Sequence, residues 1–283
     1  LTGATRHPDH VALDIAGLGI VDVPWAIGAD GMWSPLRRAL GEQLDSYRGD
    51  WHAFRQYLTG VSERAQTELM IFFDADLLPG YAWSFPLADG RVNFGFGILR
   101  GSRLDGASMS RRWDDLLERR HIRAFIGEAA EPEGQRKAWP IPTRLPGPTL
   151  TAGRTLFVGD AAALGDPMTG EGIGQALASG IGAAEAILAH PDSVDEVDAA
   201  YTDWVAGHLE PDTRMANLLS RALQHRKGAR AAIATAGLTP WTRRNFARWL
   251  FEDEPRGVLF TPKRLHTSFL RRDGAFVDGS PAN

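Results

Sequence analysis

An apolar strand, an acidic turn and a glycine-started helix follow one another in residues 156–182, LFVGDAAALGDPMTGEGIGQALASGIG. Leu156-Phe157-Val158 predict the strand, and Gly159-Asp160 place a carboxylate at its carboxyl end. Three further glycines let the backbone approach a ligand before the helix predicted over 175–186. The first turn of such a helix offers unpaired N–H groups and the positive end of the helix dipole. The stretch therefore predicts a ligand-binding turn, and a glycine-rich turn without a ligand is the alternative.

A second strand-to-helix segment lies in residues 26–38, AIGADGMWSPLRR. Asp30-Gly31 form the predicted turn, and Ser34 and Pro35 are the predicted N-cap and first residue of a helix. Taken alone, this segment is ambiguous, because Asp-Gly is a common turn and Arg37 could be a solvated helix charge. Because this segment lies ahead of the first one in the chain, the two together are a stronger signal of a binding site than either alone.

Aromatic residues alternate with small ones in residues 79–86, PGYAWSFP, and an apolar run follows at 90–97, GRVNFGFG. The pattern predicts two strands joined by a turn at Ala88-Asp89-Gly90. Alternation places Tyr81, Trp83 and Phe85 on one face of the first strand. This face either bounds a cavity or packs as ordinary core, and the sequence leaves both readings open.

Together the three segments resemble the geranylgeranyl reductase family of FAD-dependent oxidoreductases, in the aromatic hydroxylase-like flavoprotein superfamily. The run from G-D-A-A to P-x-x-G-x-G-I resembles the second FAD fingerprint of that superfamily, and A-D-G-x-x-S-x-x-R resembles its Asp-Gly motif. Y-x-W-x-F-P looks like the signature of the geranylgeranyl reductases, although flavin halogenases carry a similar W-x-W-x-I-P. The resemblance covers about residues 5–190.

The resemblance implies FAD as the cofactor and a role for particular residues. In the superfamily, the aspartate at the position of Asp160 holds the ribitol chain, and the helix amides face the pyrimidine end of the flavin. Asp30 is expected near the flavin and pyrophosphate, and Tyr81, Trp83 and Phe85 are expected to bound the substrate. No catalytic proton donor is identified, since the Tyr81 phenol is a weak acid near neutrality. The expected cofactor-binding residues are Asp30, Gly31, Arg37, Gly159, Asp160, Pro167, Gly170, Gly172, Ile173 and Gly174.

The superfamily opens with a strand, a G-x-G-x-x-G turn and a helix that bind the FAD pyrophosphate. The sequence contains no such segment. From the resemblance we expect this N-terminal unit to be missing, so that the chain alone binds FAD weakly. Either another chain supplies the unit, or the molecule is a truncated, non-catalytic lipid-binding protein.

The expected fold class is α/β (α+β), with a partial FAD/NAD(P)-binding Rossmann-like domain, an inserted antiparallel β-sheet substrate domain and a helical C-terminal region. Residues 1–44 and 151–190 are expected to form the FAD-binding domain, and residues 45–150 the substrate-binding sheet. Residues 191–283 are expected to be the helical region, with helices predicted at 197–209 and 211–225.

Composition excludes several other classes. A net charge of −4 gives no general attraction for nucleic acid. The absence of cysteine excludes disulfides and thiolate metal sites and suits a reducing cytoplasm. The eight histidines follow no metal-ligand spacing, so no metal is predicted. No apolar run is long enough to span a bilayer.

The C-terminal part carries a further pattern, in which aromatic residues from Trp241 to Phe251 interleave with arginines. The pattern is typical of a helix in a membrane interface, and also of a surface helix docked on its own core, which is the favoured interpretation. A cytoplasmic protein, with peripheral membrane contact as the alternative, is the expectation.

The predicted function is reduction of carbon–carbon double bonds in an isoprenoid lipid or lipid-quinone tail by reduced FAD. The electron donor, NAD(P)H or a ferredoxin-like protein, is left open. The alternatives are an FAD-dependent aromatic monooxygenase or hydroxylase, a halogenase-like enzyme, and the non-catalytic lipid-binding protein. Many hydroxylases place His after G-D-A-A, where this chain has Ala163, which favours the reductase.

Overall fold

The computed structural model describes residues 1–43, 46–101 and 106–243, which divide into two compact units. Unit 1 comprises Leu1–Tyr47, Pro142–Leu223 and the described residues from Lys227 onward, and unit 2 comprises Arg48–Ile141 with Gln224–Arg226. The predicted α/β class is confirmed. Of the aromatic and arginine-rich segment at 241–251, residues beyond 243 lie outside the described part of the chain.

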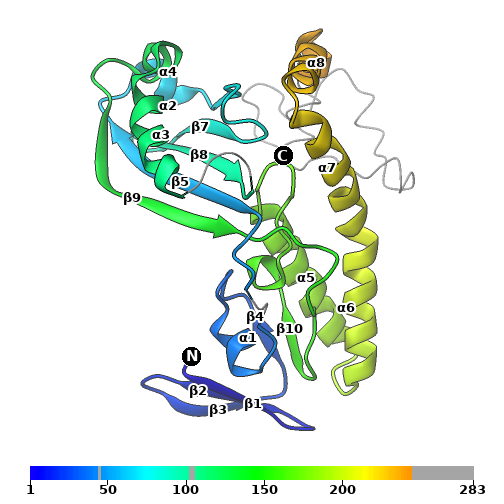
Figure 1. The fold of residues 1–283 in the computed structure, drawn as a ribbon. Helices are drawn as coiled ribbons and strands as arrows, with labels where there is room; N and C mark the ends of the chain where they lie inside the picture. The colour runs from blue at the N-terminus through cyan, green and yellow to red at the C-terminus, as the bar shows by residue number, and fades with distance from the viewer. Residues whose placement is uncertain (44–45, 102–105, 244–283) are drawn as a thin grey trace, which may run out of the picture. The chain divides into compact units, whose positions relative to one another are not determined.

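Unit 1 combines a small antiparallel sheet with a parallel strand pair and helices (Figure 1). Its elements are β1 (Gly3–Arg6), β2 (Val11–Ile15), β3 (Gly19–Val23), β4 (Ala26–Gly28), α1 (Pro35–Ala39), β10 (Thr155–Phe157), the 3₁₀ turn η1 (Gly159–Ala162), α5 (Ile173–Ala189), α6 (Val194–His208) and α7 (Glu210–Leu223), followed by α8 (Arg226–Gly237).

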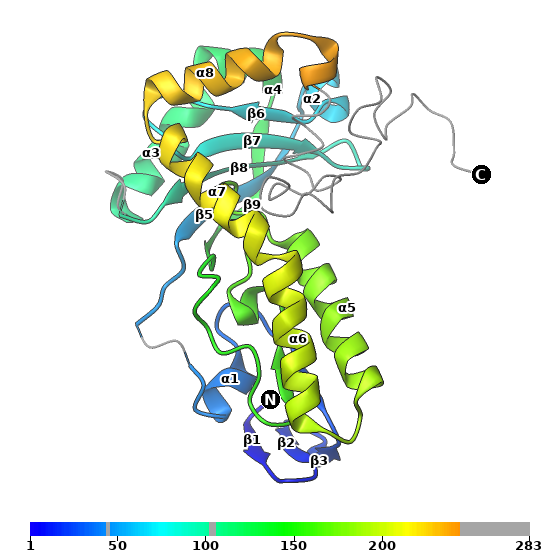
Figure 2. The same cartoon turned by 90° about the vertical axis from the view of Figure 1, so that its right-hand side faces the viewer.

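The parallel pair brings the two strand-to-helix segments together. β4 and β10 pair with Gly28 opposite Phe157, and the N–H of Val158 donates to the Gly28 carbonyl at 3.1 Å. Both strands therefore end at the same edge, which is where α/β sheets bind ligands. α6 runs beside α5 (Figures 1 and 2), and the Tyr201 hydroxyl donates to the Phe157 carbonyl at 2.8 Å. Residues 191–223 thus belong to unit 1 with α5.

Unit 2 is an antiparallel five-stranded sheet in the order β6-β7-β8-β5-β9, with β6, β7 and β8 side by side in Figure 2. Its elements are β5 (Trp51–Thr59), α2 (Glu63–Thr67), β6 (Met70–Phe72), β7 (Tyr81–Pro86), β8 (Val92–Leu99), α3 (Gly106–Glu118), α4 (Arg120–Ile126) and β9 (Glu131–Ile141).

One face of this sheet packs on the helices and forms the core of unit 2. Phe94 and Phe96 of β8 are fully buried, and both rings contact the indole of Trp113 in α3. The ends of the unit also meet, because Trp51 pairs with Ile141 and the Asp50 N–H donates to the Ile141 carbonyl at 3.0 Å. No helix in the described part of the chain is long and apolar enough to cross a membrane.

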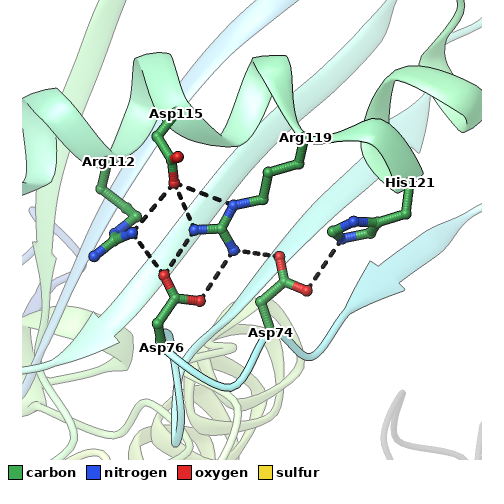
Figure 3. A network of polar contacts seen from close by, with 6 residues as sticks. All are labelled: Asp74, Asp76, Arg112, Asp115, Arg119 and His121. Carbon is green, nitrogen blue, oxygen red and sulfur yellow. Dashed lines mark hydrogen bonds and ion pairs between the residues drawn. The ribbon is translucent and has the colours of Figure 1, made fainter.

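A network of charges fixes the loop between β6 and β7 to α3 and α4 (Figure 3). Arg119 forms ion pairs with Asp74 at 2.5 Å, Asp76 at 2.7 Å and Asp115 at 2.6 Å. Arg112 adds a second contact to Asp76 at 2.6 Å, and His121 lies 3.1 Å from Asp74. Arg119 therefore holds three carboxylates that would otherwise repel one another.

We expect Arg119→Met to lower the unfolding free energy by about 1–2 kcal/mol at neutral pH. The loss is smaller than for a fully buried ion pair, because water screens the two carboxylates that are about half exposed. The Arg119 hydrogen bonds hold the pKa values of Asp76 and Asp115 below their ordinary 3.8. This stabilisation is present above pH 3.8 and is lost as the pH falls through the lowered pKa values. Urea unfolding should therefore show a deficit that shrinks in acid. Arg120→Met, an exposed neighbouring arginine, is the control, and an equal loss there would contradict the network's role.

Candidate functional site

The Asp160 carboxylate lies beside the first turn of α5. Asp160 is the second residue of η1, and a Cβ built on Gly172, the N-cap of α5, would be 3.3 Å from its Oδ1. No side chain caps α5, so the first-turn N–H groups keep their hydrogen-bonding capacity. Burial raises the pKa of Asp160 above its ordinary value, and no hydrogen bond to its carboxylate exists among the described residues. The half-buried Asp160 carboxylate, an acceptor, thus lies beside the free N–H donors of the first turn of α5.

Gly159 sets the close approach of η1 to α5. Its φ of +53° is in the left-handed region, and a Cβ there would come within 2.9 Å of the Ala176 Cβ. The Gly159 N–H donates to the Ser179 hydroxyl in α5 at 3.0 Å. These contacts explain why a glycine precedes the aspartate, and they fix Asp160 at the helix N-terminus.

The loop that leads into α5 is ordered by Asp166, which sequence reasoning missed. Its Oδ1 accepts hydrogen bonds from the N–H groups of Met168 at 3.0 Å and Thr169 at 2.7 Å, and from the Thr169 hydroxyl at 2.8 Å. The Gly170 N–H donates to the Asp166 carbonyl at 2.9 Å. The signal in the sequence was the spacing D-P-x-T, since aspartate readily bonds the backbone two and three residues ahead.

The Asp-Gly segment folds as predicted, with Ser34 as the N-cap of α1 and Pro35 as its first residue. The Ser34 hydroxyl accepts from the Arg37 N–H at 3.0 Å. Asp30 adds a second cap, because its Oδ2 accepts from the Leu36 N–H at 2.9 Å. Asp30 and Gly31 follow β4 at the edge where Asp160 follows β10, so the parallel pair brings the two motifs together.

Arg37 is buried inside unit 1 and is not a solvated charge. Its guanidinium donates to the backbone carbonyls of Ala161 and Thr149, and to that of Glu42 at 3.0 Å. The same group lies 4.0 Å from the centroid of the Phe157 ring. Burial lowers the pKa of Arg37 to about 10, so the group stays charged near neutrality. Arg37 therefore ties α1 to η1 and to the chain before β10, and its expected cofactor contact stays a prediction.

The remaining predicted cofactor residues lie around the same helix N-terminus. Pro167 is buried in the loop, Gly170 has a φ of +71°, and Gly174 and the exposed Ile173 begin α5. Gln175, in the same first turn, was missed: its Oε1 is buried and has no hydrogen-bond partner among the described residues. Together with the Asp160 carboxylate, this acceptor suits a ligand that carries O–H and N–H donors, such as the ribitol hydroxyls and the single pyrimidine N–H of FAD.

The predicted aromatic face exists in unit 2, on the side of the sheet opposite the helices. Tyr81, Trp83 and Phe85 are partly exposed, with ring centroids 5.9 and 6.0 Å apart in sequence order. β7 and β8 pair as the predicted hairpin, and Trp83 lies opposite Gly95. Ala82 and Ser84, on the other side of β7, are fully buried, so the aromatic side is the more exposed side of this strand.

Among the described residues, no group of three His, Cys, Asp or Glu side chains forms a candidate metal site. Each unit carries one candidate functional feature. Unit 1 carries a strand edge with the uncapped α5 N-terminus and the Asp160 and Gln175 acceptors. Unit 2 carries an aromatic sheet face.

The model of the FAD binding domain family matches residues 17–190, more than half of the chain. Among curated proteins, the digeranylgeranylglycerophospholipid reductase of Methanothrix thermoacetophila is 30% identical over 187 residues, which cover 66% of this chain and 45% of that protein. The menaquinone reductase of Mycobacterium tuberculosis is 33% identical over 196 residues, covering 62% of this chain and 43% of that protein. The chain thus matches less than half the length of these relatives.

Solved structures share the fold. A geranylgeranyl bacteriochlorophyll reductase-like protein from Thermoplasma acidophilum superposes with a TM-score of 0.66 at 19% identity, covering 93% of this chain and 68% of that one. A halogenase in complex with FAD gives a TM-score of 0.63 at 13% identity, covering 90% of this chain and 56% of that one. These likenesses confirm the architecture expected from the sequence resemblance.

Proposed function

We propose a function for this chain from one premise: it belongs to the FAD binding domain family, and FAD is its cofactor. We place the flavin end of FAD at the shared edge of β4 and β10. The observation that carries this placement is the uncapped N-terminus of α5 beside the Asp160 carboxylate, which has no hydrogen-bond partner among the described residues. A helix N-terminus favours negative charge, and a buried carboxylate needs donors.

Each residue at this edge has a distinct task in the proposal. The Asp160 carboxylate accepts hydrogen bonds from ribitol hydroxyls, and Gln175 Oε1 accepts from a further donor of the cofactor. The N–H groups of residues 172–174 donate to acceptors on the flavin, whereas those of Gly170 and Glu171 are already bonded to Asp166 and Thr169. Asp166 keeps these N–H groups in place through its bonds to the loop. Bound FAD supplies hydride transfer, and the protein supplies position and electrostatics.

The proposed reaction is reduction of carbon–carbon double bonds in an isoprenoid lipid or lipid-quinone tail. The support is twofold: the relatives named above are reductases of a digeranylgeranylglycerophospholipid and of menaquinone, and unit 2 presents an aromatic face able to hold an apolar chain. One alkene carbon accepts the hydride and the other a proton. The proton donor and the reductant, NAD(P)H or a ferredoxin-like protein, are not assigned.

Two other functions remain as outcomes of the test. An aromatic monooxygenase or halogenase-like enzyme would use the same fold. Ala163 is fully buried, and its methyl group offers no proton relay at this position, which favours the reductase. A non-catalytic protein that holds a lipid on the aromatic face is the alternative of another class.

Titration with FAD followed by anaerobic reduction with dithionite tests the proposal. Geranylgeraniol or menaquinone is then added to the reduced protein. A reductase reoxidises the flavin and yields a product whose mass has risen by a hydrogen pair for each reduced double bond. A product that has gained an oxygen atom in air would identify a monooxygenase. Lipid binding without flavin reoxidation would identify a non-catalytic lipid-binding protein.

Trp83→Ala should lower kcat/KM for the isoprenoid at least about tenfold, because the indole forms the centre of the aromatic face. Its effect on the unfolding free energy should stay near 1–2 kcal/mol, below the roughly 3–5 kcal/mol of a buried Trp→Ala change. Trp113→Ala is the matched control, since this indole is buried on the opposite face and should lose stability with little selective kinetic change. If Trp83→Ala and Trp113→Ala lower the melting temperature equally and do not differ in kcat/KM, the aromatic face is ordinary core.

A further inference from the structure

Successive side chains at the end of β6 lie on opposite sides of the unit 2 sheet. Phe72, the last residue of β6, packs on the helix side, where its ring centroid lies 5.9 Å from that of His121 and 5.8 Å from that of Phe125. Phe73 lies on the other side, with its ring centroid 6.0 Å from that of Tyr81. This is the alternation of an extended chain. Phe73 therefore belongs to the aromatic face, although the pattern at 79–86 did not include it.

Asp74, the next residue, returns to the helix side. Its carboxylate forms an ion pair with Arg119 at 2.5 Å and lies 3.1 Å from Nε2 of His121 (Figure 3). The side chains of Asp74 and Arg119 are 19% and 17% exposed, so water screens this pair less than the pairs of the network that have half-exposed carboxylates. The residues before and after Phe73 are therefore both held on the helix side.

The loop from Asp74 to Tyr81 is tied together by its own backbone. The Leu77 N–H donates to the Asp74 carbonyl at 2.9 Å, and the Gly80 N–H donates to the Leu77 carbonyl at 2.7 Å. Leu77 is buried in the core, and a Cβ built on Gly80 would come within 2.0 Å of the Gly97 carbonyl oxygen. Because these bonds run from Asp74 to Gly80 without a break, a contact that holds Asp74 also restrains Tyr81, the next residue.

The packing of Phe73 itself is a weak restraint. The residue is 36% exposed, and its ring meets that of Tyr81 at an interplanar angle of 51°, without stacking. An exposed aromatic pair contributes little against the conformational entropy of a chain that nothing else holds. The position of Phe73 therefore depends on the contacts that its neighbours make on the helix side.

We propose that Arg119 is a positioning residue for the aromatic face. From the opposite side of the sheet, its ion pair with Asp74 holds Phe73 against Tyr81, so this end of the face is ordered before a ligand arrives. A ligand that binds to the face then orders less of the protein, which favours binding. The inference rests on the proposed function for the identity of the ligand, whereas the positioning of Tyr81 depends on no ligand.

Fluorine NMR of protein labelled with 3-fluorotyrosine tests the positioning directly. The chain contains four tyrosines, and Tyr81→Phe identifies the Tyr81 signal. Arg119→Met should shift and broaden this signal, because the neighbouring Phe73 ring becomes mobile, and Phe73→Leu should shift it in the same direction. Arg119→Lys keeps a charge beside Asp74 without the guanidinium fork and should restore part of the wild-type position. The signal of Tyr201, in unit 1, should not change.

Arg123→Met is the matched control. Arg123 is about as buried as Arg119, and its ion pair with Glu118 at 3.0 Å and its hydrogen bond to the Ala130 carbonyl at 3.1 Å hold α4 to α3 and to the chain before β9. Its loss should leave the Tyr81 signal in place. An unchanged Tyr81 signal in Arg119→Met, or an equal shift in Arg123→Met, would overturn the proposal, because the network would then stabilise unit 2 without positioning the face.

Binding of geranylgeraniol to the same samples, measured by equilibrium dialysis, tests whether a ligand needs this order. Arg119→Met should raise the dissociation constant about three- to tenfold. In a protein that already carries Phe73→Leu, the same change should have almost no further effect, because Arg119 acts through Phe73. Additive effects of the two substitutions would contradict that route. Far-UV circular dichroism verifies each fold, and Asp74→Asn, which removes the charge of one partner, replaces Arg119→Met if that variant unfolds.

Turnover of geranylgeraniol by the dithionite-reduced flavoprotein separates this inference from the proposed function. Arg119→Met should raise KM by the same factor as the dissociation constant and leave kcat within about twofold, because Arg119 acts on binding. A shifted Tyr81 signal and weaker binding without reduction would support the positioning role and remove the reductase proposal. Reduction with an unchanged KM in Arg119→Met would overturn the positioning role alone.

Discussion

Arg37→Met should lower the unfolding free energy of unit 1 by about 3–5 kcal/mol, the largest single effect we expect. Methionine keeps an apolar side chain of similar length but leaves the carbonyls of Ala161, Thr149 and Glu42 without their donor. Each buried carbonyl left unpaired costs roughly 1–3 kcal/mol, reduced where water can enter. Urea unfolding followed by far-UV circular dichroism measures the change.

Two further variants test this role of Arg37. Arg37→Lys should recover less than half of the loss, because one ammonium group cannot reach three carbonyls in a fixed fork. Arg38→Met changes the exposed neighbouring arginine and should stay within about 0.5 kcal/mol of wild type. A fall in the unfolding free energy of less than about 1 kcal/mol for Arg37→Met would mean that the guanidinium does not hold α1 to η1 and to the chain before β10.

Asp160→Asn should weaken FAD binding by about 1.5–3 kcal/mol, the range for a hydrogen bond to a charged group. Asparagine keeps the shape and an acceptor but removes the charge that ribitol hydroxyls would stabilise. Isothermal titration with FAD measures the change, and Asp192→Asn at an exposed position of unit 1 is the control. Undiminished affinity would remove Asp160 from the cofactor site.

The same variant has an opposite effect on the protein without FAD. Burial raises the pKa of Asp160 above its ordinary 3.8, because the ionised carboxylate is better solvated in the unfolded chain than in the folded protein. The stability from this group is therefore full below pH 3.8 and is lost as the pH rises through the raised pKa. Asp160→Asn should remove this decline and be slightly more stable at neutral pH, while wild-type FAD affinity should rise over the same interval. A variant less stable than wild type at neutral pH would contradict the desolvated carboxylate.

The local parts of the site could be predicted from sequence because they depend on neighbours along the chain. Ser34 caps α1 through a hydrogen bond to Arg37, three residues ahead, and the strand, turn and helix around Asp160 follow one another directly. The hairpin that carries Tyr81, Trp83 and Phe85 follows from alternation and a short turn. Propensity and pattern capture such features well.

Contacts between distant residues could not be predicted in this way. The sequence predicted a cofactor contact for Arg37, with a solvated helix charge as the alternative, and its buried role was missed because its partners Thr149 and Ala161 lie 112 and 124 residues away. The pairing of Arg55 with Lys137 depends on the register of β5 and β9, which shifts just beyond Arg55 at an irregularity that no local pattern indicates. A shift of one residue would place these side chains on opposite faces.

The pairing of Trp51 with Ile141 has a consequence for folding order. Unit 1 is assembled from two stretches of chain that unit 2 separates, so β4 and β10 can pair only after a long loop has closed. Loop closure becomes less favourable by about 0.6 kcal/mol for each doubling of length. If unit 2 folds first, its two ends lie together and connect the two stretches of unit 1 as a short linker would. Most of the entropy cost of closing the loop has then been met before β4 and β10 pair. Variants that weaken only the sheet of unit 2 should therefore slow the appearance of the cofactor site, although they touch none of its residues.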